Sequence, residues 1–332
     1  MFVMRILTLV MASALSLIVP SGDDADSTEF LAMFWNLENF FDYRDGGGGA
    51  SDSEFTPDGL RHWNASRFYA KCNAISKAIY WVSDRYGRLP DVVGVAEVEN
   101  RDVLVRLLHS TALRKAGYSI VHYDSPDHRG IDVALLWRSE TMELMASKPC
   151  HIDGMATRDI LLTRLRCRKD GREIGCAVVH LPSKYGGGKT SQKRKKAAER
   201  LYAVVDSVRA AGCRDVLTMG DFNDVPSASE FNVLKALMRN LSAPLAERGE
   251  GSIRFNGKWN LIDMFWATAE LADKASVSVL KIPFLMTRDN AMGGEKPLRT
   301  YLGSSYAGGV SDHCPILMEI GRGRQWIYDK NN

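Results

Sequence analysis

The sequence predicts an α/β fold in which strands and helices alternate and pack in layers. Short apolar runs of strand length end at polar residues in six places, and helical patterns lie between several of them. The order strand, helix, strand, helix, strand in the first part of the chain is typical of layered α/β proteins. By length the 332 residues allow two domains, but large α/β folds reach this size as one, and an apolar fraction of 45% is ample for a core.

The six predicted strands each carry a polar tip. The pairs of strand and tip are Leu31–Trp35 with Asn36, Val92–Ala96 with Glu97, Cys176–Val179 with His180, Val216–Met219 with Asp221, Leu261–Ile262 with Asp263, and Asp312–His313 before Ile316 and Leu317. Polar tips of buried strands are where α/β sheets usually place their chemistry. Carboxylates can hold a hard cation, an amide side chain can orient the groups beside it, and imidazoles can transfer protons. The set therefore indicates metal-assisted phosphoryl chemistry.

The first helix is predicted from about Ser66 to Arg85, because apolar residues recur there at steps of three and four. Its inward face comprises Phe68, Cys72, Ile75, Ile79 and Val82. A shorter helix is expected over Arg101–His109, followed by strands over Tyr118–Tyr123 and Ile131–Trp137. The loop between these strands carries Arg129, whose guanidinium can hold phosphate oxygens with two parallel hydrogen bonds. The alternative is a solvated hairpin arginine.

The second half of the chain continues the alternation. The expected segments are a hairpin of Ile160–Cys167 and Ile174–His180, a helix ending near Arg209, a helix over Ser229–Met238, an irregular insertion over Asn240–Asn260, strands over Leu261–Ala267 and Ser276–Ile282, and a loop over Thr287–Gly309. Loops beside a site commonly set substrate choice. The last loop directly precedes the Asp312–His313 pair, so we expect it to influence which substrate is taken.

A lysine-rich stretch runs from Ser183 to Lys196, directly after the His180 strand. Four consecutive cations at residues 193–196 stand at the start of the predicted helix, where the helix dipole disfavours positive charge. A phosphate-bearing ligand would offset that cost, and on this ground Ser183, Lys184 and Arg194 are candidates for substrate binding. The alternative is a solvated basic face. The net charge of +3 does not by itself indicate a nucleic-acid partner, so any basic surface must be local.

The six cysteines show no spacing typical of a zinc site, and we expect most of them to be small core residues. Cys167 and Cys176 flank a turn of the predicted hairpin. A turn at Asp170–Gly171 places Cys167 opposite Ile174, whereas a turn at Gly171–Arg172 places the two cysteines opposite each other and would allow a disulfide.

Residues 1–22 are separate from the predicted fold. Arg5 is followed by an apolar run from Ile6 to Val19, which is too short and too close to the terminus for a comfortable membrane span. We interpret the segment as a signal peptide, although no clean A-x-A cleavage site follows it. The alternatives are an uncleaved anchor and a misassigned start codon. The interpretation predicts an exported protein, periplasmic or secreted, with no transmembrane segment in the mature chain.

Five motifs together resemble the endonuclease/exonuclease/phosphatase superfamily, which includes DNase I, exonuclease III, neutral sphingomyelinases and inositol polyphosphate 5-phosphatases. In chain order the motifs are Trp35-Asn36-Leu37-Glu38-Asn39, Glu97, His180-Leu181-Pro182-Ser183, Gly220-Asp221-Phe222-Asn223 and Ser311-Asp312-His313. The resemblance covers about Phe30 to Ile320. It implies a single catalytic domain over residues 30–322 with the DNase I-like fold, a four-layer α/β sandwich of two packed mixed β-sheets flanked by helices.

The resemblance also implies a metal site. Glu97, a lone carboxylate at a strand tip, is the first ligand, and Asp312 faces the metal directly or through water. Asn36 and Glu38 share a strand face by the two-residue period, so both are expected to reach the metal. The oxygen ligands suit Mg²⁺ or Mn²⁺, with Ca²⁺ as an alternative.

The remaining motif residues take the catalytic roles of the family. His313 resembles the general base, and the ordinary histidine pKa of about 6.5 suits proton removal near neutral pH. Asp263 stands where the family has its orienting aspartate. Asp221 and Asn223 match the pair that holds the nucleophile and phosphate, and His180 matches the second histidine, which contacts the phosphate and assists the leaving group. Family members also carry a phosphate-contacting polar residue near Arg129.

These implications predict an extracytoplasmic, metal-dependent nuclease that hydrolyses DNA or RNA phosphodiester bonds, and no stable protein partner is implied. DNase I-like members have histidine at the position of His180, whereas exonuclease III-like members have tyrosine. The resemblance therefore favours an extracellular enzyme of the DNase I or sphingomyelinase type over a cytoplasmic repair enzyme. The same site would serve a phosphodiesterase or phosphatase for lipid or small phosphate esters, and exposed apolar loops would favour lipid. A non-catalytic binding module on this fold would be expected to lose some motif residues, and none is missing.

Overall fold

The computed structural model describes residues 28–47, 49–184 and 188–321. The predicted signal peptide and residues 185–187 of the lysine-rich stretch lie outside this part of the chain. None of the helices within the described ranges combines the length and apolar character needed to cross a membrane.

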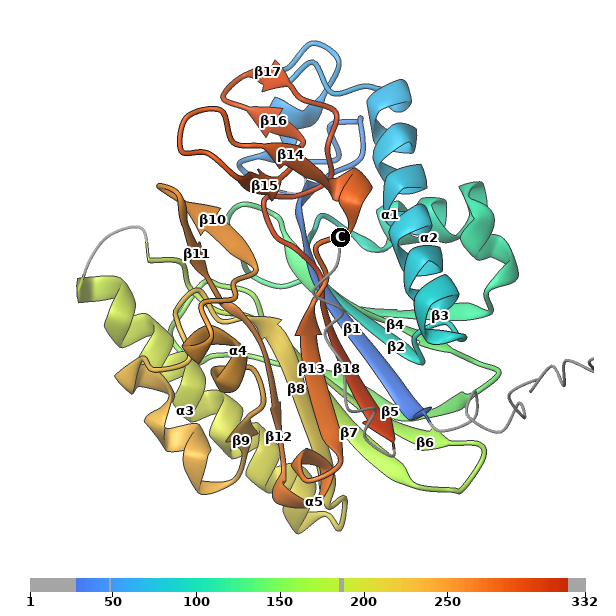
Figure 1. Cartoon of the computed structure of the whole chain (residues 1–332), viewed down its shortest axis with the longest axis vertical. Coiled ribbons are helices and arrows are strands. Elements are labelled where there is room, and N and C mark those ends of the chain that lie inside the picture. Colours follow the sequence, from blue (N-terminus) through green and yellow to red (C-terminus); the bar gives the residue numbers. More distant parts are fainter. Residues whose placement is uncertain (1–27, 48, 185–187, 322–332) are drawn as a thin grey trace, which may run out of the picture.

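Two six-stranded sheets form the centre of the molecule (Figure 1). The first sheet has the order β13 (Ala275–Val279), β18 (Ile316–Gly321), β1 (Thr28–Phe40), β2 (Val92–Val98), β4 (Asp132–Arg138), β3 (Tyr118–His122). The second sheet has the order β5 (Met142–Cys150), β6 (Ile160–Cys167), β7 (Glu173–His180), β8 (Asp215–Asp221), β12 (Asp263–Ala267), β9 (Arg239–Asn240). Both sheets are mixed, because β1 is parallel to β2 and β7 is parallel to β8 while the other neighbours are antiparallel.

Helices cover the outer face of each sheet. α1 (Ala65–Tyr86) and α2 (Arg101–Ser110) lie on the first sheet, and α3 (Gly188–Ala210) lies on the second (Figure 1). Successive residues of β1 alternate between the layers: Leu31 and Met33 pack under α1 and α2, whereas Ala32 and Phe34 pack against the second sheet. All these side chains are buried, and burial of apolar surface is the main force holding the layers together. The predicted four-layer α/β sandwich is confirmed.

The predicted helices agree with the structure because their local signals are strong. α1 begins after Asn64, whose side chain accepts a hydrogen bond from Arg67 N, and ends at Gly87 with φ of 74°. α2 begins after Asn100, which caps Val103 N in the same way. Asparagine at the N-cap and a left-handed glycine after the last turn are the preferred ends of a helix.

Several connecting segments differ from their predictions. β5 was not expected, and the helix expected at Ser229–Met238 is a 3₁₀ helix, η3 (Ser229–Ala236). The segment expected to be irregular contains α4 (Ala243–Glu247), β10 (Ile253–Phe255) and β11 (Lys258–Asn260), and the loop expected at Thr287–Gly309 forms β14 (Met286–Arg288), β15 (Glu295–Pro297), β16 (Tyr301–Leu302) and β17 (Ser305–Tyr306). The other short elements are η1 (Asp52–Phe55), η2 (Ala112–Lys115), α5 (Ala269–Ala272) and η4 (Pro283–Leu285).

The β10–β11 hairpin had a readable sequence signal. Its turn is Asn256-Gly257, with φ of 48° and 75°, and Asn-Gly is the preferred pair for a tight turn that needs two positive φ values. The pairing of Phe255 with Lys258 confirms a two-residue turn.

The register of the β6–β7 hairpin matches neither predicted alternative. Cys176 lies opposite Thr163, and Leu165 lies opposite Ile174. The reason is a longer turn: Cys167 N donates to Arg172 O at 2.8 Å, which leaves four residues in the turn instead of two. All six cysteines fall within the described ranges, and each is buried and free.

Candidate active site

The site lies where polar strand ends of the two sheets meet. Within the second sheet, His180 is level with Asp221 across β7 and β8, and Asp221 is level with Asp263 across β8 and β12. The three side chains therefore come from three neighbouring strands at the same height. β1 and β2 of the first sheet bring Asn36 and Glu97 to the same end.

A cleft of about 400 Å³ opens at this point. The predicted residues that line it are Glu38, Glu97, Arg129, His180, Ser183, Asp221, Asn223, Asp312 and His313. Asn36 and Asp263 lie one layer behind, hydrogen-bonded to Asp221 and His313 respectively. Lys184 and Arg194 do not line the cleft. His128, an exposed residue on the same loop as Arg129, also lines it.

His313 and Asp263 form a buried pair. Nδ1 of His313 is 2.7 Å from Asp263 Oδ2, which fixes the ring so that Nε2 faces the cleft, 3.9 Å from Asp221 Oδ2. Burial by itself lowers the pKa of His313, but the charge and hydrogen bond of Asp263, with Asp312 and Asp221, raise that pKa well above its ordinary value. The ordinary histidine pKa expected from the sequence therefore does not hold for this buried imidazole.

Two contacts fasten the His313 loop to the first sheet. The indole Nε1 of Trp35 donates to His313 O at 2.8 Å, and Ser311 Oγ donates to Asn36 O at 2.6 Å. Ser311 Oγ also accepts from His313 N at 2.9 Å. Trp35 and Asn36 therefore set the position of the imidazole although neither touches its ring nitrogens.

Asp221 is the central carboxylate of the site. Its Oδ1 accepts from Asn223 N at 2.8 Å, and its Oδ2 accepts from Asn36 Nδ2 at 3.0 Å. Burial is the main reason that its pKa rises to about 7, and the negative charge of Asp263 adds to the rise. The preceding glycine is required, because a Cβ on Gly220 would lie 2.2 Å from the carbonyl oxygen of Val179.

His180 is buried beside Asp221, with Nε2 3.6 Å from Asp221 Oδ2. Its Nδ1 has no hydrogen-bond partner among the described residues. Burial, reinforced by the charges of Arg158 and Arg129, lowers its pKa well below the ordinary value. His180 is therefore a neutral imidazole at physiological pH, and it can donate one hydrogen bond to a ligand oxygen without carrying charge.

The acidic side of the cleft has a strained backbone. Glu38 and Glu97 have φ of 48° and 60°, and Asn39 and Asn223 are also positive. Such φ values cost about 1–3 kcal/mol each in residues other than glycine and concentrate at functional sites. The strain overturns the expectation that Asn36 and Glu38 share a strand face, because the β1–β2 register shifts between Asn36 and Phe40.

The two side chains consequently point to different partners. Both polar atoms of the Asn36 amide are hydrogen-bonded within the protein. Its Nδ2 donates to Asp221, and its Oδ1 accepts from Glu38 N at 2.9 Å. Both oxygens of Glu38 are also engaged, by Arg299 Nε at 2.7 Å and Thr300 N at 2.9 Å. Asn36 is thus placed to position Asp221, and the prediction that it reaches a metal from the same face as Glu38 is wrong.

The cleft still suits a hard divalent cation, which prefers oxygen ligands. Glu97 uses Oε2 to accept from Asn39 N at 2.8 Å, and Asp312 uses Oδ2 for an ion pair with Arg299 at 3.1 Å. In the described ranges, no hydrogen bond engages Glu97 Oε1 or Asp312 Oδ1. These two oxygens are the best-placed ligands. Glu38, Glu97 and Asp312 do not bring three ligand atoms within 4.8 Å of one another, unlike Asp221, Asp263 and His313.

The predicted basic residues divide into two groups. Arg129 reaches the cleft, where Nη2 donates to Asn39 Oδ1 at 2.6 Å and lies 3.7 Å from Glu97. Arg194 is buried and pairs with Asp224 at 3.1 Å and Glu230 at 3.4 Å, so its predicted role as a substrate contact is wrong because its charge is neutralised within the protein. Lys184 is half exposed but shares Asp224, at 2.5 Å.

Three cations that were not predicted from the sequence belong to the site. Arg158 lines the cleft and pairs with Asp127 at 2.9 Å, and Arg299 lines it between Glu38 and Asp312. Lys71 is buried in α1 and donates to Glu38 O at 2.6 Å. Burial lowers its pKa to about 8. Its position three residues after Phe68 puts it on the inward helix face, and that signal could have identified it.

The arrangement has the parts needed to attack a phosphorus centre. The cleft combines an imidazole oriented by a carboxylate, the pair Asp221 and Asn223, and the acidic side chains of Glu38, Glu97 and Asp312. Arg129 and His180 add donors for anionic oxygens.

Comparisons with known proteins agree with this geometry. A family model described as "Endonuclease/Exonuclease/phosphatase family" matches residues 31–322. A solved structure of an endonuclease/exonuclease/phosphatase family protein from Bacteroides thetaiotaomicron has a TM-score of 0.57 at 13% identity, covering 89% of this chain and 98% of that one. The solved structure of a mannosyl-6-phosphatase from the same organism has a TM-score of 0.56 at 13% identity, covering 88% of this chain and 99% of that one.

A third solved structure, D. rerio TDP2 complexed with a single-stranded DNA product, gives a TM-score of 0.55 at 14% identity and covers 88% of this chain and 99% of that one. At such identities these likenesses show the fold alone. No curated protein matches the sequence.

Proposed function

The chain belongs to the endonuclease/exonuclease/phosphatase family, and from this premise we propose that it is a metal-dependent phosphodiesterase acting outside the cytoplasm as a nuclease on DNA or RNA. His313 is the general base in this proposal, and Asp263 keeps its ring in place. The apolar run after Arg5 supports the extracytoplasmic location.

The chemistry follows from the positions of the side chains. Neutral His313 takes the proton of the attacking water at Nε2, and Asp221 and Asn223 hold that water and a phosphate oxygen. A cation on the neighbouring carboxylates would offset the negative charge that raises the pKa of this imidazole. His180 and Arg129 donate hydrogen bonds to the remaining oxygens as charge builds on them. A divalent cation held by Glu97 and Asp312 would neutralise charge at the phosphate and favour departure of the leaving oxygen.

One observation favours a chain-like substrate over a compact one. The cleft adjoins two further hollows and shares lining residues with each of them. One hollow, of about 400 Å³, meets the cleft at His128, Arg158 and Ser183 and is also lined by Lys193. The other meets the cleft at Glu38, Asn39 and Arg299. A polymer threaded through all three places its scissile phosphate in the middle, whereas a small ester would use the centre alone.

A second candidate, a phosphodiesterase for lipid substrates, is favoured by a different observation. Four of the large apolar side chains with high exposure lie on loops and hairpins near the cleft: Leu60, Phe255, Met292 and Leu302, each 55–67% exposed. They belong to the loop before α1 and to the hairpins β10–β11, β14–β15 and β16–β17, which gather at one end of the molecule (Figure 1). Exposed apolar tips of this kind suit insertion into a lipid interface.

A substrate panel separates the two candidates. Purified protein would be offered plasmid DNA, RNA, sphingomyelin vesicles and a soluble phosphate diester, each with and without EDTA. The nuclease proposal expects nucleic-acid cleavage that EDTA abolishes. Cleavage of sphingomyelin far in excess of DNA would favour the lipid candidate, and activity that persists in EDTA would contradict the role of the metal. Cell fractionation would test the location.

A further inference from the structure

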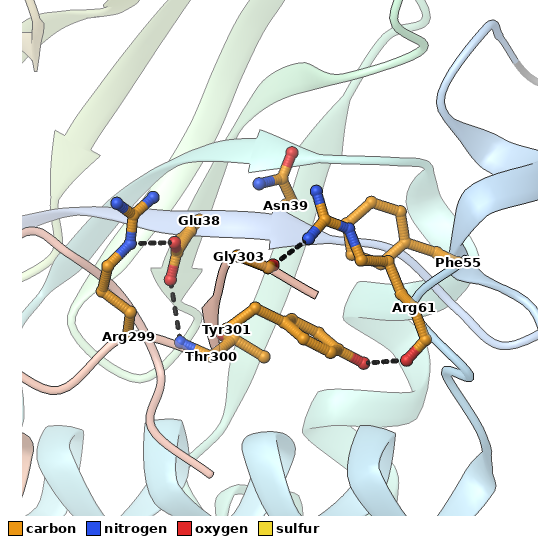
Figure 2. Close-up of a pocket in the computed structure, with 8 residues that line it drawn as sticks. All are labelled: Glu38, Asn39, Phe55, Arg61, Arg299, Thr300, Tyr301 and Gly303. Carbon is orange, nitrogen blue, oxygen red and sulfur yellow. Dashed lines mark hydrogen bonds and ion pairs between the residues drawn. The ribbon is translucent and has the colours of Figure 1, made fainter. Parts of the chain in front are cut away.

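The hollow on the Arg299 side of the cleft, which we name the Arg61 pocket, is formed by Glu38, Asn39, Phe55, Arg61, Arg299 and Tyr301 (Figure 2). It encloses about 200 Å³. A water molecule occupies about 30 Å³ in the liquid, so this space is large enough for a tetrahedral anion and the atoms bonded to it. Glu38, Asn39 and Arg299 form the wall that the pocket shares with the cleft, so its occupant would be attached close to the reacting phosphate.

Arg61 is fixed in place before any ligand arrives. Its carbonyl oxygen accepts from Tyr301 Oη and from Arg67 Nη1, both at 2.8 Å. Its Nη1 donates to the carbonyl oxygen of Gly303 (Figure 2). Its Nε lies 3.6 Å from the carboxylate of Glu54, a half-exposed partner outside the pocket lining whose pairing is weakened by solvent. The guanidinium also lies over two rings, 5.9 Å from the Phe55 centroid and 5.5 Å from the Tyr301 centroid. A cation held by rings and hydrogen bonds loses little freedom when it binds an anion.

The pocket has spare donors and no spare acceptor of comparable strength. Both oxygens of Glu38 already accept, from Arg299 Nε and Thr300 N. Among the described residues, no acceptor lies within hydrogen-bond distance of Arg61 Nη2 or Asn39 Nδ2. The faces of Phe55 and Tyr301 that Arg61 covers are not open to a stacking base. The unused capacity therefore calls for an anionic, acceptor-rich group.

We propose that the Arg61 pocket binds a second phosphate of the substrate, adjacent to the phosphate that is cleaved. The inference rests on the proposed nuclease function, because a nucleic-acid chain supplies such a neighbouring phosphate at every unit. Arginine is the side chain best suited to a phosphate, since its fork donates two parallel hydrogen bonds. The pocket then selects substrates with at least two phosphates and sets where along the chain the cut falls.

Binding and turnover are measured with matched compounds. Binding of thymidine 3′,5′-bisphosphate is compared with that of the 3′- and 5′-monophosphates by calorimetry, with EDTA present. Turnover is compared for thymidine 5′-(p-nitrophenyl phosphate) with and without a 3′-phosphate. The wild type is expected to prefer the doubly phosphorylated compounds by about 10- to 100-fold, the value of one hydrogen bond to a charged group.

The Arg61→Gln variant should lose this preference through a raised Kd and KM for the doubly phosphorylated compounds, while the singly phosphorylated ones are handled as before. Arg61→Lys keeps the charge without the fork and should retain part of the preference. Arg239→Gln, at the far end of the second sheet (Figure 1), is the matched control and should change nothing. Thermal unfolding of each variant verifies that the fold is intact.

Two outcomes would overturn the inference: equal affinity of the wild type for bisphosphate and monophosphates, or an Arg61→Gln variant that weakens both classes alike. Either leaves the nuclease proposal standing if the nitrophenyl esters are still cleaved. Conversely, Arg61-dependent preference for the bisphosphate in a protein that cleaves no phosphodiester would support the pocket and reject the proposed function.

Discussion

The Asp263–His313 hydrogen bond joins residues from different sheets. Asp263 begins β12 in the second sheet, and His313 precedes β18 in the first. If the pair acts as a unit, His313→Ala should lower kcat by about 10²- to 10⁴-fold, the usual contribution of a general base. Asp263→Asn should be almost as damaging, and the double variant no worse than His313→Ala, because residues in one mechanism are not additive. Multiplied losses in the double variant would show that the two act separately.

Glu97 offers a second test at the scale of one side chain. Glu97→Gln keeps the shape and an oxygen able to accept from Asn39 N, but it removes the charge that would hold a cation. Turnover should fall by about 100-fold or more, as when one preorganised electrostatic group is lost, and the apparent metal requirement should rise. Glu143→Gln on β5, a half-exposed glutamate that does not line the cleft, is the control. Near-normal activity at limiting metal would contradict the metal assignment.

Side chains at strand tips were predictable, whereas cations from other elements were not. Asp221 and His180 follow apolar runs of strand length, so local pattern was enough to find them. Arg299 lies in a loop and meets Glu38, 261 positions earlier, only after both sheets have formed. Arg158 likewise reaches the cleft through its pairing with Asp127. Isolated arginines in loops carry no local signal that distinguishes such partners.

At the scale of elements, β5 shows why a strand can be missed. Its residues alternate between buried and exposed without a clear period, and it carries Lys148 and Pro149. Both residues are common at sheet edges, where one side of the strand needs no hydrogen bonds, and β5 is the edge of the second sheet. The central strands were predictable because burial on both faces leaves continuous apolar runs.

The start of β4 contains a carboxyl group whose ionisation should weaken the fold. Burial raises the pKa of Asp132 to about 7, although a hydrogen bond from Ser125 partly opposes the rise. The unfolded chain has the ordinary value of 3.8, so between about pH 4 and 7 the folded protein keeps a proton that the unfolded chain has lost. The free energy of unfolding therefore decreases as pH rises through this window and levels off above it.

Asp132→Asn stays neutral at every pH and should escape this loss. Its free energy of unfolding minus that of the wild type should be higher at pH 8 than at pH 5, by up to about 1.4 kcal/mol for each pKa unit crossed. Urea unfolding at the two pH values measures the difference. Asp153→Asn, at an exposed position, is the control and should show none. A pH-independent difference for Asp132→Asn would mean that its carboxyl ionises in the folded protein as it does in the unfolded chain.

At the scale of the whole molecule, the division of strands between two sheets could not be read from local patterns. β1 pairs with β18, nearly 300 residues later, and with β2 (Figure 1). Such pairing depends on which apolar faces meet after collapse, and both sheets offer similar buried faces. The resemblance to a known family supplied the four-layer arrangement, because order of motifs along the chain reflects a shared topology more directly than hydrophobic pattern does.

The basic face of α3 tests whether a long polyanion lies along the molecule. Lys193, Lys195 and Lys196 are exposed, and Lys193 lines the hollow beside Ser183. Arg194 must be left intact, because its buried pairs with Asp224 and Glu230 make it structural. The informative variant is therefore the triple replacement of the three lysines by alanine, with Lys115, Lys148 and Lys274, which are exposed but do not line the cleft, as the matched control set.

If nucleic acid lies along α3, each lysine that contacts a phosphate releases counterions on binding. The logarithm of the association constant should then fall with the logarithm of salt concentration by about 0.9 per duplex phosphate contacted. The triple variant should weaken DNA binding and reduce the magnitude of that slope by up to the contribution of three phosphate contacts. Hydrolysis of a small soluble diester should stay unchanged, because none of the three lysines lines the catalytic cleft. The control triple should leave the slope as it is. An unchanged slope in the α3 variant would mean that its lysines are solvated and contact no phosphate. If the protein also cleaved sphingomyelin strongly, the lipid phosphodiesterase would be favoured over the nuclease, with the same catalytic residues.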